Sequence, residues 1–209
     1  MTIDRTVAIV GGSAITTLVI ASLLVLKPWG SGDPFADCRN TVISGGAGAI
    51  GGPFTLYDET GKTVTDADVI TGPTLVYFGY TFCPDVCPVH MQRTAEAVQQ
   101  LEDKGIMVTP VMISVDPDRD TPERLAEWTD YLHPRMLGLS GTAEQIKEVA
   151  KAYKAQYSVP ADRSSPDYTV DHITLTYLMM PGHGFVELFG PNESADNMAS
   201  KTACFVNAA

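Results

Sequence analysis

Two cysteines, Cys83 and Cys87, are the residues whose type and spacing point most directly to chemistry. A Cys-x-x-x-Cys can hold a soft metal ion, or it can cycle between a dithiol and a disulfide. The β-branched and aromatic run 74–80 predicts a buried strand before the pair, and the run 91–105 predicts a helix after it. Both sulfurs should then lie near a helix N-terminus, whose partial positive charge favours thiolate over thiol.

Two thiolates alone leave a soft ion such as Cu(I) thinly coordinated, and a third ligand would complete a trigonal site. The chain has four histidines that can be considered for this role. His90 follows the cysteines on the same predicted helix, and His172 precedes a predicted strand at 174–180. In a thioredoxin-like sheet, the loop that carries His172 approaches the N-terminus of the helix that follows the cysteines. Histidine has many structural uses, however, so position alone leaves His172 open as a ligand. We expect His133 and His183 to be solvated surface residues.

Composition restricts the class of protein before any fold is assigned. With 209 residues, of which 44% are hydrophobic and 19% charged, the chain can bury one core, so one globular domain is expected. The formal net charge of −11 argues against binding to nucleic acid, whose phosphates need a basic surface. It argues equally against attachment to a membrane surface through a polybasic patch.

The N-terminal segment carries the second strong signal. Residues 7–26 contain no charged side chain and are flanked by Arg5 and Lys27. As a helix this run would be about 30 Å long, which is enough to cross a bilayer core. A cleaved signal peptide is the alternative, although its apolar region is usually shorter. We therefore predict a transmembrane anchor at residues 1–27, with the globular domain outside the cytoplasm.

The rest of the chain divides into a linker and one domain. Residues 28–53 are rich in glycine and proline, which favours a linker, and residues 54–209 form the predicted globular domain. Within it we predict a hairpin at 54–65, strands at 108–115, 135–139, 175–180 and 185–189, and helices at 122–132, 143–157 and 194–205. Strands alternating with helices, followed by a closing hairpin, predict an α/β fold with thioredoxin-like topology.

Three motifs resemble blocks of one known family. Residues 77–88, which include the cysteine pair, are similar to the signature of the Sco/SenC family of copper-binding cytochrome c oxidase assembly proteins. Residues 114–123 resemble the second block of that family, and residues 170–172 resemble its third. The blocks follow the family order and span residues 54 to about 190, nearly the whole predicted domain.

The resemblance implies a thioredoxin fold in which Cys83, Cys87 and His172 bind copper, as Cu(I) and also as Cu(II) if both states are bound. It also implies a role in preparing the dinuclear copper centre of cytochrome c oxidase subunit II. Asp116 and Asp118 match acidic positions of the family, which implies contact with the ligands or with a partner. A turn-forming, helix-capping loop is an equal alternative for these two carboxylates.

Two classes of function remain open. The first is a membrane-anchored copper chaperone, a binding and transfer protein rather than an enzyme, in which two thiolates and one imidazole exchange the ion with a partner. The second is a thiol–disulfide oxidoreductase that reduces the copper-ligand cysteines of its target or senses redox state. A peroxidase is a weaker third option. The family further implies the periplasmic side of a bacterial inner membrane, where a copper donor or a thioredoxin-like reductant would act as a second partner.

Two more cysteines lie outside the family motifs. Cys38 falls in the predicted linker and Cys204 in the last predicted helix. In an oxidising compartment we expect a disulfide between them, and the alternative is a pair of free thiols.

Overall fold

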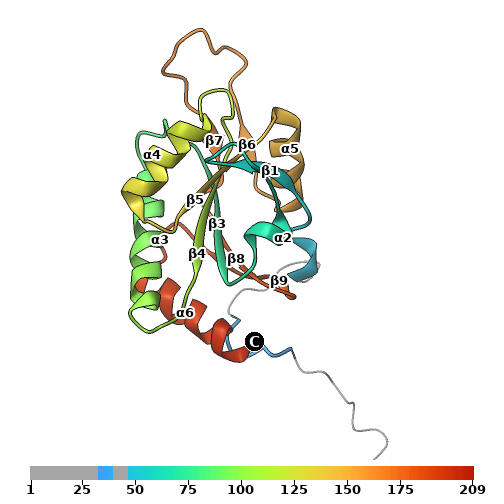
Figure 1. Ribbon diagram of the computed structural model, residues 1–209, viewed down its shortest axis with the longest axis vertical. Coiled ribbons are helices and arrows are strands. Elements are labelled where there is room, and N and C mark those ends of the chain that lie inside the picture. Colours follow the sequence, from blue (N-terminus) through green and yellow to red (C-terminus); the bar gives the residue numbers. More distant parts are fainter. Residues whose placement is uncertain (1–32, 40–46) are drawn as a thin grey trace, which may run out of the picture. The chain divides into compact units, whose positions relative to one another are not determined.

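The computed structural model describes residues 33–39 and 47–209 (Figure 1). The chain divides into two units, 1–34 and 35–209, and the fold below is that of the second unit. The predicted membrane anchor at 1–27 lies outside the described residues. Within the described ranges, no helix is both long enough and apolar enough to cross a bilayer.

A seven-stranded mixed sheet forms the centre of the domain. Its strands are β1 (Thr55–Asp58), β2 (Thr63–Thr65), β3 (Thr74–Gly79), β4 (Thr109–Ser114), β5 (Leu137–Ser140), β8 (Thr176–Met180) and β9 (Gly184–Phe189). They lie in the order β2-β1-β5-β4-β3-β8-β9, with β3, β4 and β5 parallel and the other neighbours antiparallel. Every residue of β3 and of β8 is buried, as expected for central strands covered on both faces.

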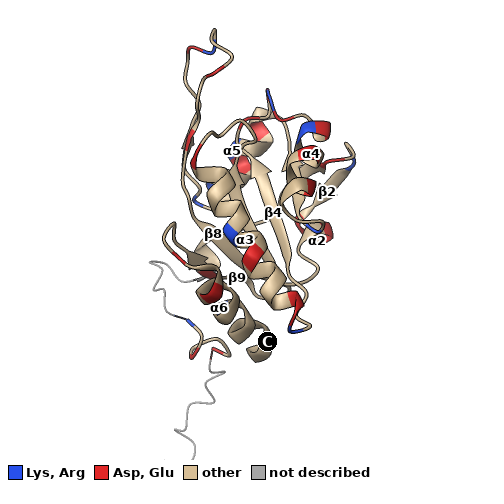
Figure 2. Cartoon of the chain, turned by 90° about the vertical axis from the view of Figure 1, so that its left-hand side faces the viewer, with Lys and Arg blue, Asp and Glu red and all other residues tan. Residues whose placement is uncertain are grey.

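Helices cover both faces of this sheet. The helical elements are η1 (Ala47–Ala49), α2 (Asp66–Val69), α3 (Val86–Glu102), α4 (Pro122–Leu132), α5 (Ala143–Ala152) and α6 (Ala195–Ala208). In Figure 1, α3, α4 and α6 lie on one side of the sheet and α5 lies on the other. Charged residues lie largely in helices and loops (Figure 2). The central strand β4 carries no charged residue. The core is therefore apolar on both sides of the central strands.

The connections around the site follow the thioredoxin pattern. The chain forms a parallel β3–α3–β4 unit. In the same sheet, β8 pairs in antiparallel fashion with β3, and the hairpin β8–β9 leads into α6. Long crossovers through a helix are what parallel neighbours require, whereas β8 and β9 need only the tight turn at 181–183. The predicted α/β, thioredoxin-like domain is thus confirmed, and the transmembrane helix stays a prediction.

A second, two-stranded sheet was not expected from the sequence. Tyr157–Ser158 (β6) pairs in antiparallel fashion with Asp171–His172 (β7). The loop 159–170 between them projects beyond the body of the domain (Figure 1). This small sheet matters because it fixes the backbone on both sides of His172.

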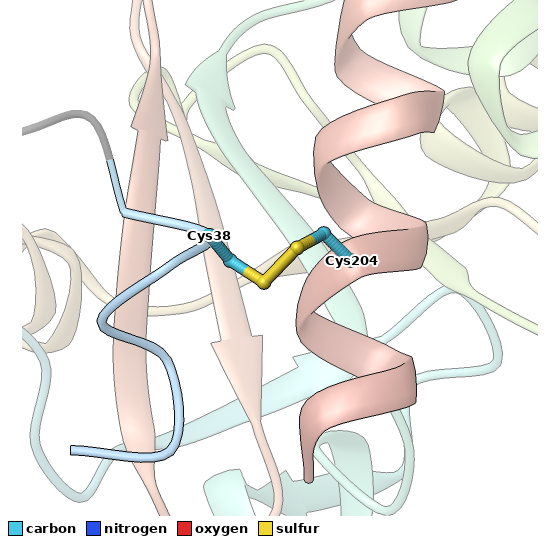
Figure 3. Close-up of a disulfide and its surroundings, with 2 residues drawn as sticks. All are labelled: Cys38 and Cys204. Atoms are coloured by element: carbon cyan, nitrogen blue, oxygen red, sulfur yellow. A yellow bond between two sulfur atoms is a disulfide. The ribbon is translucent and has the colours of Figure 1, made fainter. Parts of the chain in front are cut away.

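The last helix is attached to the start of the unit by a disulfide. Cys38 is bonded to Cys204 of α6, with 5.7 Å between their Cα atoms (Figure 3). The ring of Phe35 also packs beside the ring of Phe205, with centroids 5.4 Å apart. Parts of the predicted linker that the structure describes therefore contact the domain, while the predicted boundaries themselves remain untested.

Three further details differ from the sequence predictions. The helix predicted at 143–157 ends at Ala152, and Tyr157 belongs to β6 instead. The helix after the cysteines begins at Val86 rather than at Met91, so Cys87 lies in its first turn. His133 was expected at the surface, but it is 5% exposed. Its Nδ1 accepts the backbone N–H of Arg135 at 3.2 Å, which gives this histidine a structural use at the end of α4.

Candidate metal centre

The two cysteines lie at the junction of β3 and α3. Cys83 is in the turn after β3, and Cys87 is in the first turn of the helix. Asp85 is the N-cap residue, but its side chain makes no capping hydrogen bond. Instead, the backbone N–H of Cys87 donates to Sγ of Cys83 at 3.3 Å. The sulfur of Cys83 thus satisfies one of the free N–H groups with which every helix begins.

This arrangement separates the acidities of the two thiols. A hydrogen bond from the Cys87 side chain, aided by the Cys87 backbone N–H, lowers the pKa of Cys83 to about 4. The same hydrogen bond and burial raise the pKa of Cys87 far above its usual value. Cys83 is therefore the thiolate of the pair at neutral pH, and Cys87 holds the proton that a bound metal ion would displace.

His172 approaches Cys83 and Cys87 from a segment that lies much later in the sequence. In the small β6–β7 sheet, His172 is paired with Tyr157. The backbone N–H of the following residue, Ile173, donates to the carbonyl of Gln156 at 2.9 Å. The ring Nδ1 lies 3.1 Å from the carbonyl oxygen of Ile173, which fits an Nδ1–H donor. That tautomer leaves the lone pair on Nε2, the atom that faces the cysteines.

The three side chains form a compact ligand group. Nε2 of His172 is 3.2 Å from Sγ of Cys87, and the ligand atoms of Cys83, Cys87 and His172 all lie within 4.8 Å of one another. Among the described residues this is the one group of at least three histidine, cysteine or acidic side chains with such spacing. Two soft sulfurs and one imidazole suit a soft ion such as Cu(I) in trigonal coordination. His90, His133 and His183 do not belong to this group.

Two tyrosines line the group. The ring of Tyr77 and the ring of Tyr80 both stand nearly perpendicular to the ring of His172, with centroids 5.8 and 5.7 Å away. The hydroxyl of Tyr77 lies 4.0 Å from Sγ of Cys87 and 3.4 Å from Nδ1 of His90. Burial raises the pKa of Tyr77, so the hydroxyl stays protonated and can donate. The sequence predicted only a buried strand here, and the aromatic side chains at 77, 78 and 80 were the signal that was available.

Asp120 is a further residue that the sequence prediction missed. Its buried carboxylate accepts the backbone N–H of Thr81 at 3.1 Å and the hydroxyl of Thr81 at 2.6 Å. The hydroxyl of Ser114 donates to the same carboxylate at 2.6 Å. Burial raises the pKa of Asp120. The carboxylate thus connects the end of β4 to the loop that carries Cys83.

Asp116 and Asp118, the acidic pair that the sequence singled out, take different roles. Asp116 is 1% exposed, accepts the hydroxyl of Tyr168 at 2.7 Å and pairs with Arg119. Asp118 is exposed and pairs with Arg163. Neither carboxylate is part of the ligand group. Capping of the following helix belongs to Thr121, whose hydroxyl accepts the N–H of Arg124 at 3.3 Å.

A surface hollow opens beside the third ligand. It has a volume of about 410 Å³ and is lined by Gln156, Tyr157, Ser158, Asp171, His172 and Ile173. Both cysteines are buried, whereas His172 is only partly so. The imidazole is therefore the most exposed of the three ligands.

A thioredoxin-like fold with a Cys₂His group at the start of its first long helix defines a class of proteins that use thiols to hold a soft metal ion or to exchange disulfides. The sequence profile of the SCO1/SenC family matches residues 44–207. The chain belongs to the SCO1/SenC family, which confirms the resemblance carried by the three motifs.

Individual relatives agree with this assignment. Protein SenC of Rhodobacter capsulatus is 48% identical over 208 residues, which cover 98% of this chain and 92% of SenC. SCO1 homolog 1, mitochondrial, of Arabidopsis thaliana is 42% identical over 74% of this chain and 46% of its own length. The chain thus spans about half of that mitochondrial relative. The crystal structure of Arabidopsis thaliana ScoI with copper bound superposes with a TM-score of 0.71 and 40% identity, over 76% of this chain and 99% of that one.

Proposed function

We propose that this protein is a copper chaperone that binds Cu(I) through Cys83, Cys87 and His172. The observation that carries the proposal is the approach of Nε2 of His172 to Sγ of Cys87, at 3.2 Å, within a group that already contains a thiolate. Thiol exchange alone would not need an imidazole there, whereas a trigonal Cu(I) site does. The copper-bound Arabidopsis ScoI, at 40% identity, supports copper as the metal.

We further propose that the copper is passed to cytochrome c oxidase subunit II, where it contributes to the dinuclear centre. A three-ligand site whose most exposed ligand is His172 suits transfer by ligand exchange, because an incoming thiolate can replace one ligand at a time. The anchor at 1–27 would hold the domain on the periplasmic face of a bacterial inner membrane, beside that target.

The test is to load the reduced protein with Cu(I) and to count its ligands by X-ray absorption. We expect one copper per chain with two sulfur ligands and one nitrogen ligand. Transfer is then followed by mixing the loaded protein with the copper-free soluble domain of subunit II and measuring copper on each after separation. A shell of sulfur alone, or no copper retained, would contradict the proposed function.

A second function is favoured by the lowered pKa of Cys83. As a thiolate, Cys83 can attack a disulfide of the target, form a mixed disulfide and release one target thiol. Cys87 then attacks Sγ of Cys83 and releases the second target thiol, so that the target is reduced and the pair Cys83–Cys87 is oxidised. A thioredoxin-like reductant would have to restore the pair. Copper binding needs the same reduced pair, so the two functions are compatible.

A further inference from the structure

Arg119 packs against aromatic rings from both segments that carry the ligand group. Its guanidinium carbon is 3.6 Å from the ring centroid of Tyr168 and 4.6 Å from that of Phe82. Phe82 directly precedes Cys83, and Tyr168 lies in the loop 159–170 that leads to His172. One side chain therefore packs against both the cysteine loop and the segment that carries the histidine.

Hydrogen bonds hold this side chain in place. Nε of Arg119 donates to the carboxylate of Asp116, whose other oxygen accepts the hydroxyl of Tyr168 at 2.7 Å. One terminal nitrogen of the guanidinium donates to the carbonyl of Pro166 at 3.0 Å. Asp116 is 1% exposed and the Arg119 side chain 14% exposed, so solvent screens this ion pair little. A planar, delocalised cation is suited to lie against rings while its edge donates hydrogen bonds.

The same segment is tied to the cysteine side at a second point. The N–H of Val170 donates to the hydroxyl of Tyr80 at 3.1 Å, and the ring of Tyr80 stands against the ring of His172. At Asp171 and His172 the backbone is held by the β6–β7 pairing. The approach of loop 159–170 is thus fixed by β6 on one side and by Arg119 and Tyr80 on the other.

We propose that Arg119 is a positioning residue that keeps His172 beside Cys83 and Cys87, and that its contacts with Tyr168, Asp116 and Pro166 set the fraction of molecules whose third ligand is in place. We call this set of four residues the clasp. The apparent affinity for a metal ion falls in proportion to the competent fraction, so a loosened clasp weakens copper binding without touching a ligand. This consequence for copper rests on the proposed function, whereas the effect on the position of His172 does not.

The first test uses copper-free, reduced protein and hydrogen exchange. Arg119→Ala removes the clasp, and Arg119→Lys keeps a positive charge but not the flat, forked group. We expect amides of 159–173 to exchange about tenfold faster in Arg119→Ala, as for the loss of a desolvated cation–π contact, and to be affected less in Arg119→Lys. Arg163→Ala is the matched control, because it removes the exposed pair with Asp118 from the same loop and should change little. Unchanged exchange in both Arg119 variants overturns the proposal, whatever the protein does with copper.

The second test is a double-mutant cycle on Cu(I) affinity. Arg119→Ala should weaken binding about tenfold in the wild-type background and have no effect in a His172→Ala background, because the clasp acts only through that histidine. An equal loss in both backgrounds would assign Arg119 to the cysteine loop or to general stability, and would overturn the proposal. If Arg119→Ala does not fold, the same cycle is run with Arg119→Lys. Failure of the wild-type protein to bind Cu(I) would instead contradict the proposed function. The hydrogen-exchange test would then decide alone whether the clasp positions His172.

Discussion

Cys87 and His172 lie 85 positions apart in the sequence, and the fold brings Sγ of the first to 3.2 Å from Nε2 of the second. The cysteine belongs to the β3–α3 junction and the histidine to the separate β6–β7 sheet. The site is therefore assembled from two segments that are far apart in the sequence. Replacing the imidazole leaves both sulfurs in place, which allows metal binding and thiol chemistry to be tested separately.

His172→Ala should lower the Cu(I) affinity by more than about a hundredfold, since loss of an outer-shell partner alone commonly costs ten- to a hundredfold. Oxidation and reduction of Cys83 and Cys87 should continue, because thiol–disulfide exchange uses only the two sulfurs. Competition with a Cu(I) chelator and a redox titration of the pair measure the two effects. His183→Ala, an exposed histidine in the β8–β9 turn, is the control. An unchanged affinity in His172→Ala would remove this residue from the ligand set.

Gly79, the last residue of β3, lies against the site. A Cβ added there would lie 3.1 Å from Sγ of Cys87 and 2.7 Å from the ring of Tyr77. Gly79→Ala should therefore displace the sulfur, weaken Cu(I) binding and destabilise the domain by about 1–3 kcal/mol, as overpacking usually does. Urea unfolding and the chelator competition measure these effects. Gly72→Ala is the control because a Cβ there meets nothing within 4 Å; equal behaviour of the two variants would refute the crowding argument.

The reactivity of Cys83 should be nearly independent of pH around neutrality. With its pKa lowered to about 4, the thiol is already ionised from pH 6 upward, whereas a thiol with the ordinary value of 9.0 gains thiolate about tenfold per pH unit in that range. Alkylation of the reduced, copper-free protein with iodoacetamide, followed by peptide mapping, gives the rate at each cysteine. Cys87, which is buried and has a raised pKa, should react slowly throughout. A tenfold rise per unit at Cys83 would show that its hydrogen bonds do not stabilise the thiolate.

Asp120→Asn should lower the free energy of unfolding by about 1–3 kcal/mol, because an amide cannot reproduce the hydrogen bonds that this buried carboxyl group makes with Thr81 and Ser114. The pKa of Asp120 is raised above its unfolded value, so the folded state binds the proton more tightly. The contribution of Asp120 to the free energy of unfolding of the wild type accordingly falls as the pH rises from about 4 towards the pKa of Asp120 in the folded state. The difference in this free energy between the wild type and Asp120→Asn should therefore be largest in acid. Urea unfolding at several pH values tests this, with the exposed Asp130→Asn as control. A deficit that grows with pH would contradict the direction of the shift.

The sequence predicted those parts of the site that depend on local order. Cys83 and Cys87 follow a run of strand-forming residues and precede a helix, so their position could be inferred directly. The helix start was placed too late because the run of strong helix formers begins only at Met91. Pro88 lies in the first turn, where N–H groups have no partner within the helix.

Contacts between distant segments were beyond such reasoning. His172 was one candidate among several until the family motifs selected it. Arg119 and Asp120 were overlooked beside the more noticeable Asp116 and Asp118 that precede them. Nothing in their local sequence shows that one packs between two rings or that the other accepts hydrogen bonds from two different elements. The β6–β7 sheet was missed because each of its strands is only two residues long.

The bond between Cys38 and Cys204 closes a sequence separation of 166 residues. Replacing both cysteines by serine should lower the free energy of unfolding by about 2–5 kcal/mol, because the unfolded chain regains the entropy that the cross-link removes. The Cu(I) affinity should stay unchanged, since α6 and β7 lie at opposite ends of the domain (Figure 1). Urea unfolding under non-reducing conditions and the chelator competition provide the two measurements, and the double replacement avoids leaving a lone thiol. Mass spectrometry that finds both thiols free in oxidised wild-type protein would show that the disulfide does not form, and so would contradict the expected stabilisation.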